Sequence, residues 1–151
     1  MLNEDFDCVM NATGILGTIC NSKEGRDLVI NHLCITQLIS NISFLLNSNN
    51  SWITGNAALV LARITIEETG CQMILTHGNH HEILNKILSI LNVNDFNLST
   101  NLAFSIARLI EQEDGQKCFI DNCGQNQFVS QSLYLRKKLH LDISFSSSKP
   151  Y

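Results

Sequence analysis

The sequence is poor in proline, in aromatic residues and in charge, and each shortage narrows the choice of structures. Its single proline is Pro150, next to the end of the 151 residues, so no proline ring interrupts a helix in the body of the chain. Charged residues make up only 16% and aromatic residues 7%. Because 44% of the residues are hydrophobic, a continuous core can still form, and the length favours one compact domain.

Basic residues are also few, which argues against nucleic acid as a partner. Ten Lys and Arg against fourteen Asp and Glu give a formal net charge of −4, whereas sequence-independent binding to phosphates needs a basic surface. No run of about 18 apolar residues is present, so we expect no membrane span. Glu4, Asp5 and Asp7 stand where a signal peptide has basic residues, and we therefore expect a cytoplasmic protein.

The six cysteines do not suggest a disulfide framework, because that logic belongs to small secreted domains. Cys20, Cys34 and Cys71 stand among apolar neighbours. This context predicts small buried side chains in a reducing compartment.

Signatures of catalysis and metal binding are missing as well. The sequence has no Gly-x-Ser-x-Gly elbow and no His-Glu-x-x-His motif. His77, His80 and His81 form one loose cluster, but a zinc module needs a second pair of ligands at a suitable spacing. We expect no enzyme activity, no metal and no other cofactor.

The strongest signal is an internal repeat with a period of 45 residues. Its copies span residues 11–19, 56–64 and 101–109. Gly25, Gly70 and Gly115 follow the copies at one fixed distance, and we interpret them as turn residues that adopt positive φ. Because Asn, glycine and apolar positions all coincide at the same period, we expect each unit to be a structural repeat.

Within each unit the apolar spacing is helical. One stripe consists of Leu38, Ile39, Ile42, Leu45 and Leu46, and its copy consists of Ile83, Leu84, Ile87, Leu88 and Leu91. Such residues share one face of a helix. Sustained alternation of apolar and polar residues, the pattern of a strand, is absent. The sequence therefore predicts an all-α protein.

A period in the forties with three helical segments per unit resembles the armadillo repeat family, with HEAT-type repeats as an alternative at this period. Residues 71–78 resemble the short first helix of a repeat with the Gly turn that follows it. Residues 81–91 resemble the second helix and residues 97–111 the long third helix. The resemblance covers roughly residues 7–124 and implies a right-handed α-solenoid of about three armadillo-like repeats.

The resemblance also suggests how the chain divides. We expect armadillo-like repeats over residues 1–124, a degenerate repeat or capping helix over 125–141 and a disordered tail over 142–151, since the period decays after Cys123. The chain opens in what resembles a third helix. Solenoids need roughly three units and polar caps, so we expect a longer parent solenoid or a partner.

In the armadillo family the third helices line a groove that holds an extended segment of a partner. Helical spacing at i, i+3 and i+7 places the candidate residues on one face. They are Asn56, Leu59 and Arg63 in the second copy and Asn101, Phe104 and Arg108 in the third. The amides suit a peptide backbone, and the two arginines suit carboxylates or a phosphate.

The residues at two of these positions depart from the importin-α branch of the family, which repeats a Trp and an Asn along the third helix. Here Leu59 and Phe104 hold the Trp position, and Arg63 and Arg108 hold the Asn position. Arginines would repel the basic import signals that this branch binds. We therefore do not expect a role in nuclear import.

The expected function is that of an adaptor or scaffold whose groove binds an extended, acidic or phosphorylated protein segment. We expect no small-molecule ligand, because a short solenoid has a groove and not a pocket. The alternative is a purely structural segment of a longer armadillo solenoid, such as an assembly or chaperone cofactor. At the residue level, Arg63 and Arg108 have a second interpretation as partners of Glu67, Glu68 or Glu111, and the asparagines as partners of a neighbouring repeat's backbone.

Overall fold

The computed structural model describes residues 2–91 and 95–123, and in these ranges the chain forms eight α-helices and no strand. The prediction of an all-α fold is confirmed. In chain order the helices are α1 (Leu2–Ile19), α2 (Lys23–Ile30), α3 (Ile35–Leu45), α4 (Ser51–Ile64), α5 (Glu68–Leu75), α6 (His80–Ile90), α7 (Phe96–Leu109) and α8 (Glu113–Cys123). The capping helix expected over 125–141 and the tail expected over 142–151 lie outside the described residues.

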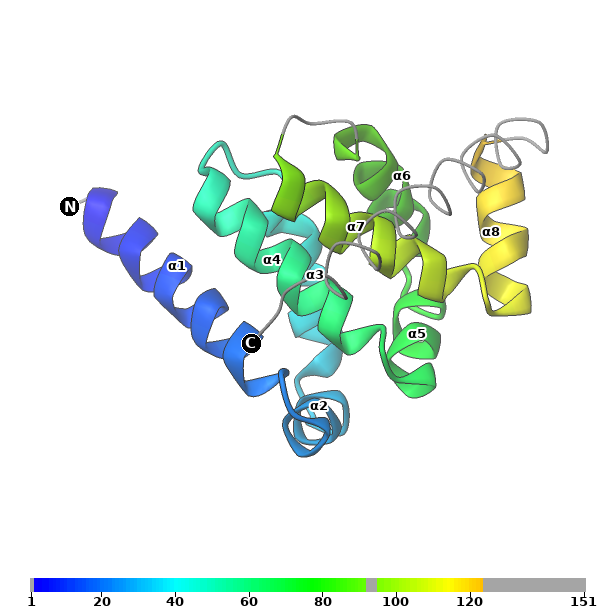
Figure 1. Ribbon diagram of the computed structural model, residues 1–151, viewed down its shortest axis with the longest axis horizontal. Coiled ribbons are helices and arrows are strands. Elements are labelled where there is room, and N and C mark those ends of the chain that lie inside the picture. Colours follow the sequence, from blue (N-terminus) through cyan, green and yellow to red (C-terminus); the bar gives the residue numbers. More distant parts are fainter. Residues whose placement is uncertain (1, 92–94, 124–151) are drawn as a thin grey trace, which may run out of the picture.

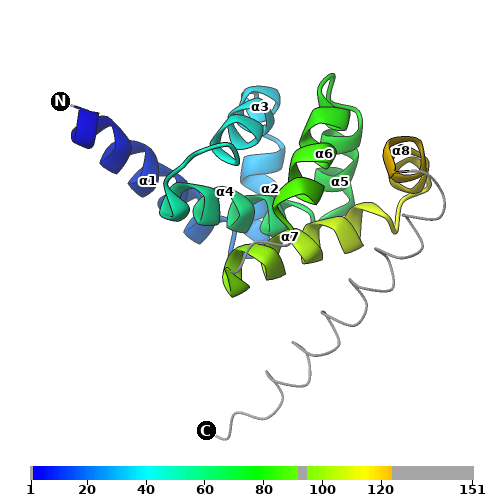
Figure 2. The same cartoon turned by 90° about the horizontal axis from the view of Figure 1, so that it is seen from above.

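The helix boundaries follow the period of the sequence. Helices α2, α5 and α8 begin at residues 23, 68 and 113, α3 and α6 at 35 and 80, and α4 and α7 at 51 and 96, so each step is 45 residues. In space α4 lies between α1 and α7, and these three long helices form one row (Figure 1). Seen from above, α3, α6 and α8 all lie on one side of that row (Figure 2).

Polar residues with short side chains fix where the long helices begin. The side chain of Asn50 accepts hydrogen bonds from the backbone N–H groups of Trp52 at 2.9 Å and Ile53 at 3.4 Å. One period later, the Asp95 carboxylate accepts from the Leu98 N–H at 2.9 Å. Both side chains satisfy amide groups that the first turn of a helix leaves without a partner.

The core is one continuous apolar interior shared by all the units. From the predicted stripes it contains Ile39, Ile42, Leu46, Ile83, Leu84, Ile87 and Leu91, all buried, with Leu38, Leu45 and Leu88 packed against it. The apolar segments of α4 and α7 complete it. The helical interpretation of both stripes is therefore confirmed.

The prediction that Gly25, Gly70 and Gly115 are turn residues with positive φ is wrong. Each lies in the first turn of a helix, and none has a φ in the left-handed region. A Cβ atom at these positions would lie only 1.8, 2.2 and 1.9 Å from the carbonyl oxygens of residues 19, 64 and 109. Glycine is needed because each short helix begins in contact with the backbone end of the long helix before it.

The prediction of three buried cysteines is wrong for one of them. Cys20 and Cys71 are fully buried, but Cys34 lies in the exposed turn before α3. Burial raises the pKa of the Cys20 thiol, and it raises the pKa of the Cys71 thiol to about 11, against a smaller opposing effect of Arg108. The Cys71 Sγ donates to the Thr65 carbonyl at 3.3 Å.

This difference predicts which thiols react. Because the thiolate is the reactive form, iodoacetamide at neutral pH should modify the exposed Cys8 and Cys34 within minutes and leave Cys20 and Cys71 unmodified in the folded protein. Peptide mapping by mass spectrometry measures this directly. Denaturation in guanidinium should remove the protection, and equal rates at Cys34 and Cys71 in the native protein would contradict the packing described.

No single helix among the described residues is long and apolar enough to cross a membrane. In the described ranges one pair of helices, α2 and α3, reaches that length and composition when taken together, and the two helices meet at an angle of 103°.

Candidate protein-binding groove

Three of the six predicted site residues line one hollow between the first halves of α4 and α7. The hollow measures about 550 Å³, and its walls include Asn56, Leu59 and Asn101. Sequence reasoning missed the other residues of its wall, among them Trp52 and Asn97, both of which are exposed. We call this hollow the α4–α7 groove. Phe104, one turn beyond Asn101 on α7, is partly buried and does not line it.

Asn56 has a partner inside the chain. Its side-chain amide donates to the Met10 carbonyl of α1 at 3.0 Å, and its amide nitrogen would lie 3.3 Å from a Cβ atom placed on Gly14. This contact agrees with the alternative interpretation of the asparagines as bonds to the neighbouring repeat. Asn101, one period later, lines the groove and makes no hydrogen bond through its side chain within the described residues.

The two arginines lie away from the groove, at the opposite ends of α4 and α7. Arg63 donates to the Gly17 carbonyl of α1. Arg108 donates from Nε to the Thr65 carbonyl at 3.3 Å and from Nη2 to the Ile66 carbonyl at 3.0 Å, at the end of α4. Each arginine therefore satisfies carbonyl groups at the C-terminal end of the preceding long helix, where a positive charge also interacts favourably with the helix dipole.

Carboxylates near these arginines follow the alternative interpretation only in part. Arg108 forms an ion pair with Glu111, three residues later and just after the end of α7. Glu67 instead pairs with Arg26 of α2, at 2.7 Å between Nε and Oε1. Three of the nitrogen atoms of Arg108 thus have partners inside the chain, which leaves this side chain poorly placed to hold an acidic ligand.

A second capping position, also periodic, lies at residues 26, 71 and 116. Arg26 donates to the Cys20 carbonyl at 3.3 Å. The Cys71 thiol donates to the Thr65 carbonyl, as described above. The Gln116 side-chain amide donates to the Ile110 carbonyl at 3.0 Å. The acceptor is always the carbonyl six residues earlier. Three different side chains thus do one task, and for this reason a comparison of residue types alone did not reveal the position.

Replacing Arg26 by methionine should lower the free energy of unfolding by about 1–3 kcal/mol, because the guanidinium is mostly buried and bonds two carbonyls as well as Glu67. Urea denaturation measures the change. The matched control is Lys117→Met, since Lys117 and Asp114 form an ion pair whose side chains are 71% and 64% exposed, and we expect no measurable effect. If both substitutions changed the free energy of unfolding equally, the bonds of Arg26 to Glu67 and to the two carbonyls would not stabilise the packing of the helices.

Histidines 32 and 77 form another periodic feature that sequence reasoning missed. The Nδ1 atom of each accepts a hydrogen bond from the backbone amide two residues later, Cys34 at 3.2 Å and Asn79 at 3.1 Å. His77 is buried, and its Nε2 lies 3.0 Å from the Ser40 hydroxyl of α3. The signal was available, because the two histidines stand one period apart.

The histidine cluster therefore has a structural explanation. His77 bonds to a turn and to α3, and the His80 and His81 rings contact each other with centroids 4.1 Å apart and a tilt of 38°. Over the residues that the structure describes, no three His, Cys, Asp or Glu side chains converge as a metal site would require.

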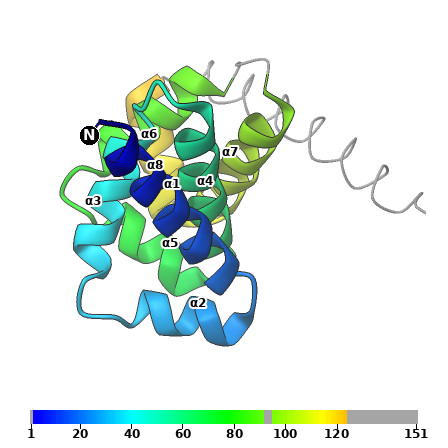
Figure 3. The same cartoon turned by 90° about the vertical axis from the view of Figure 1, so that its left-hand side faces the viewer.

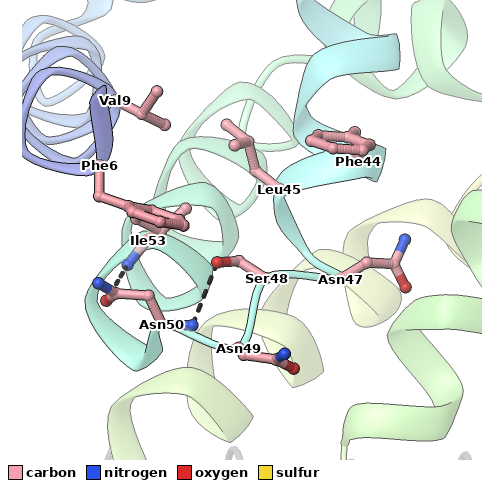
Figure 4. Close-up of a pocket in the computed structure, with 9 residues that line it drawn as sticks. All are labelled: Phe6, Val9, Phe44, Leu45, Asn47, Ser48, Asn49, Asn50 and Ile53. Atoms are coloured by element: carbon pink, nitrogen blue, oxygen red, sulfur yellow. Dashed lines mark hydrogen bonds between the residues drawn. The ribbon is translucent and has the colours of Figure 1, made fainter. Parts of the chain in front are cut away.

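Two apolar hollows lie beside α1, away from the α4–α7 groove. The larger measures about 600 Å³ and is shown in Figure 4, where Phe6 and Val9 of α1 face Phe44 and Leu45 of α3. The smaller measures about 300 Å³, between the last turns of α1 and the first turns of α3. Figure 4 also shows two hydrogen bonds at the edge of the larger hollow, from the Asn50 N–H to the Ser48 hydroxyl and from the Ile53 N–H to the Asn50 side chain.

Comparisons with known proteins add no relative: no protein-family model, no curated protein and no solved structure matches the chain significantly. Over its described residues the protein has an all-helical fold built from units 45 residues apart.

Proposed function

We propose that the chain is an armadillo-like right-handed α-solenoid that works as a non-enzymatic adaptor or scaffold, binding an extended segment of a cytoplasmic partner protein in the α4–α7 groove. The observation that carries the proposal is the wall of this groove. It combines a Trp52 side chain that is 72% exposed with the exposed Asn97 and with Asn101, whose side-chain amide has no hydrogen-bond partner among the described residues.

These side chains suit an extended peptide. An amide offers one acceptor and two donors, which matches the alternating N–H and C=O groups of an extended backbone. An exposed indole gives a rigid apolar contact for a side chain between two such bonds. The arginines contribute to stacking of the helices instead, so the proposal does not include the acidic or phosphorylated preference that was expected from them.

Selection from a library of displayed random peptides tests this function. Peptides enriched on the wild-type chain should lose binding at least about tenfold when Trp52→Ala and Asn101→Leu are combined, because both changes remove contacts of the groove. The control is Leu33→Ala, which alters a side chain that is 99% exposed between α2 and α3. If the selected peptides bind the double variant as tightly as the wild type, the groove is not the binding site.

The second candidate is a purely structural segment of a longer armadillo solenoid. It is favoured by Asn56 and Arg63, two predicted ligand-binding residues whose side chains bond to carbonyls of α1. In that case the same library should enrich no peptide above background on the wild-type chain.

A further inference from the structure

Helix α1 exposes a face whose counterparts on α4 and α7 are buried. On α1 this face consists of the exposed residues Cys8, Ala12, Ile15 and Ile19, spaced i, i+4, i+7 and i+11. The residues one and two periods later are Ile53, Ala57, Val60 and Ile64 on α4, and Leu98, Leu102, Ser105 and Leu109 on α7. None of those eight is more than 5% exposed, whereas Ile15 is 62% and Ile19 43% exposed.

The neighbours of each long helix explain this difference. Helix α3 packs against both α4 and α6, so it covers the face of α4. Among the helices that the structure describes, α1, in contrast, packs extensively only against α4. Among the described residues no helix holds the equivalent position against α1 and α3, and Figure 3 shows α1 as the outermost helix on that side.

The surface at that position is hollowed and apolar at both of its ends. The larger hollow lies between Phe6 and Val9 of α1 and Phe44 of α3. The smaller one lies between Ile19 of α1 and Leu38 of α3, with Leu28 of α2 beside them. Since α1 and α3 border both hollows, we call the surface of these two helices that contains the hollows the α1–α3 groove.

The occupant of the equivalent internal position is known, because it is α3 itself. Helix α3 has 11 residues and presents Ile35, Ile39 and Ile42, followed by Leu46, at i, i+4, i+7 and i+11. All four are at most 7% exposed. The α1–α3 groove lies one period before the interface at which α3 packs against α4 and α6. Its walls carry apolar residues, as the walls of that interface do.

We propose that the α1–α3 groove binds one amphipathic helix of a partner, about three turns long, with Ile or Leu at i, i+4, i+7 and i+11. This is the helix-in-groove mode of recognition, in which an apolar stripe fills an apolar channel. The site is separate from the α4–α7 groove and needs no extended segment, so the two proposals stand or fall independently.

A peptide with the sequence of residues 33–48 of this chain is the probe, because it carries the stripe of α3. Labelled with fluorescein, it should bind the intact protein saturably, measured by fluorescence anisotropy. Phe44→Asp and Ile19→Asp in the protein, one at each end of the groove, should each weaken binding at least about tenfold. The matched control is Phe96→Asp on α7, because Phe96 is 65% and Phe44 77% exposed, and it should leave binding unchanged.

Each other result overturns the proposal. Absence of binding, or equal binding by a peptide with Ile39→Asp and Ile42→Asp, would show that the groove does not recognise the stripe. Binding that ignores Ile19→Asp would mean that the peptide replaces α3 in its own position. Self-association of the wild-type chain that Ile19→Asp abolishes, without peptide binding, would assign the groove to a second copy. Circular dichroism of the variants confirms that helicity is unchanged in every comparison.

Discussion

Replacing Gly70 by alanine should destabilise the protein, although alanine is the better helix former. The substitution normally stabilises a helix interior by about 1 kcal/mol. Here the added Cβ would lie 2.2 Å from the Ile64 carbonyl oxygen, a backbone atom that moves only with α4. We expect the free energy of unfolding to fall by about 1–3 kcal/mol, the usual cost of overpacking, as measured by urea denaturation.

Gly55→Ala is the control for that experiment. Gly55 lies within α4, and a Cβ atom there would meet nothing within 4 Å, so this variant should gain up to about 1 kcal/mol from helix propensity alone. We therefore expect the free energy of unfolding to fall in Gly70→Ala and to rise in Gly55→Ala, although both glycines lie in helices. A stabilised Gly70→Ala variant would show that the short helices do not begin against the long ones.

The largest single loss is expected from Leu102→Ala. Leu102 is fully buried on α7, in the apolar interior that α7 shares with α4. Removing the side chain should lower the free energy of unfolding by about 2–5 kcal/mol, which combines the lost transfer energy with a cavity that the helices cannot fill. For a domain whose total stability is about 5–15 kcal/mol, the shift in the denaturation midpoint should be unmistakable.

Leu33→Ala provides the comparison, since that leucine is 99% exposed and its truncation should change stability by no more than about 0.5 kcal/mol. If the two leucine variants unfold at the same urea concentration, α7 does not pack on α4 as described.

Most of the fold could be predicted from the sequence, because the period and the apolar stripes are set by packing that recurs in each unit. The second helix predicted over 81–91 is α6 (His80–Ile90), and the third predicted over 97–111 is α7 (Phe96–Leu109). The first helix predicted over 71–78 is α5 (Glu68–Leu75), which begins three residues earlier. The error came from Gly70, which was taken for a turn residue although it lies in the first helical turn.

The candidate site could be predicted only in part, because side-chain roles depend on neighbours from other repeats. Helical spacing put Asn56, Leu59 and Asn101 on the groove face of their helices, and the structure brings these three residues to one hollow. It could not show that Arg63 and Arg108 extend back to the ends of α1 and α4, since that contact crosses between repeats. Trp52 was missed because it stands just before the repeated Asn segment, at a position without an aromatic counterpart in the first copy.

The periodic capping bonds suggest why such different residues fit one framework. A helix end must have its last carbonyls satisfied, and a guanidinium, a thiol or an amide can each donate to them. Arg26, Cys71 and Gln116 show all three solutions at one position. Backbone geometry is thus repeated more strictly than the sequence that produces it.

The central claim is that equivalent positions of successive units lie side by side along one row of helices. Nuclear Overhauser effects in the intact, methyl-labelled chain test this most directly. The row places a Leu59 methyl next to Gly17 and the Asn56 side-chain amide next to Gly14, so cross-peaks should connect both pairs. Helical chemical shifts without either cross-peak would contradict the account, because helices would then be present but not stacked in this register.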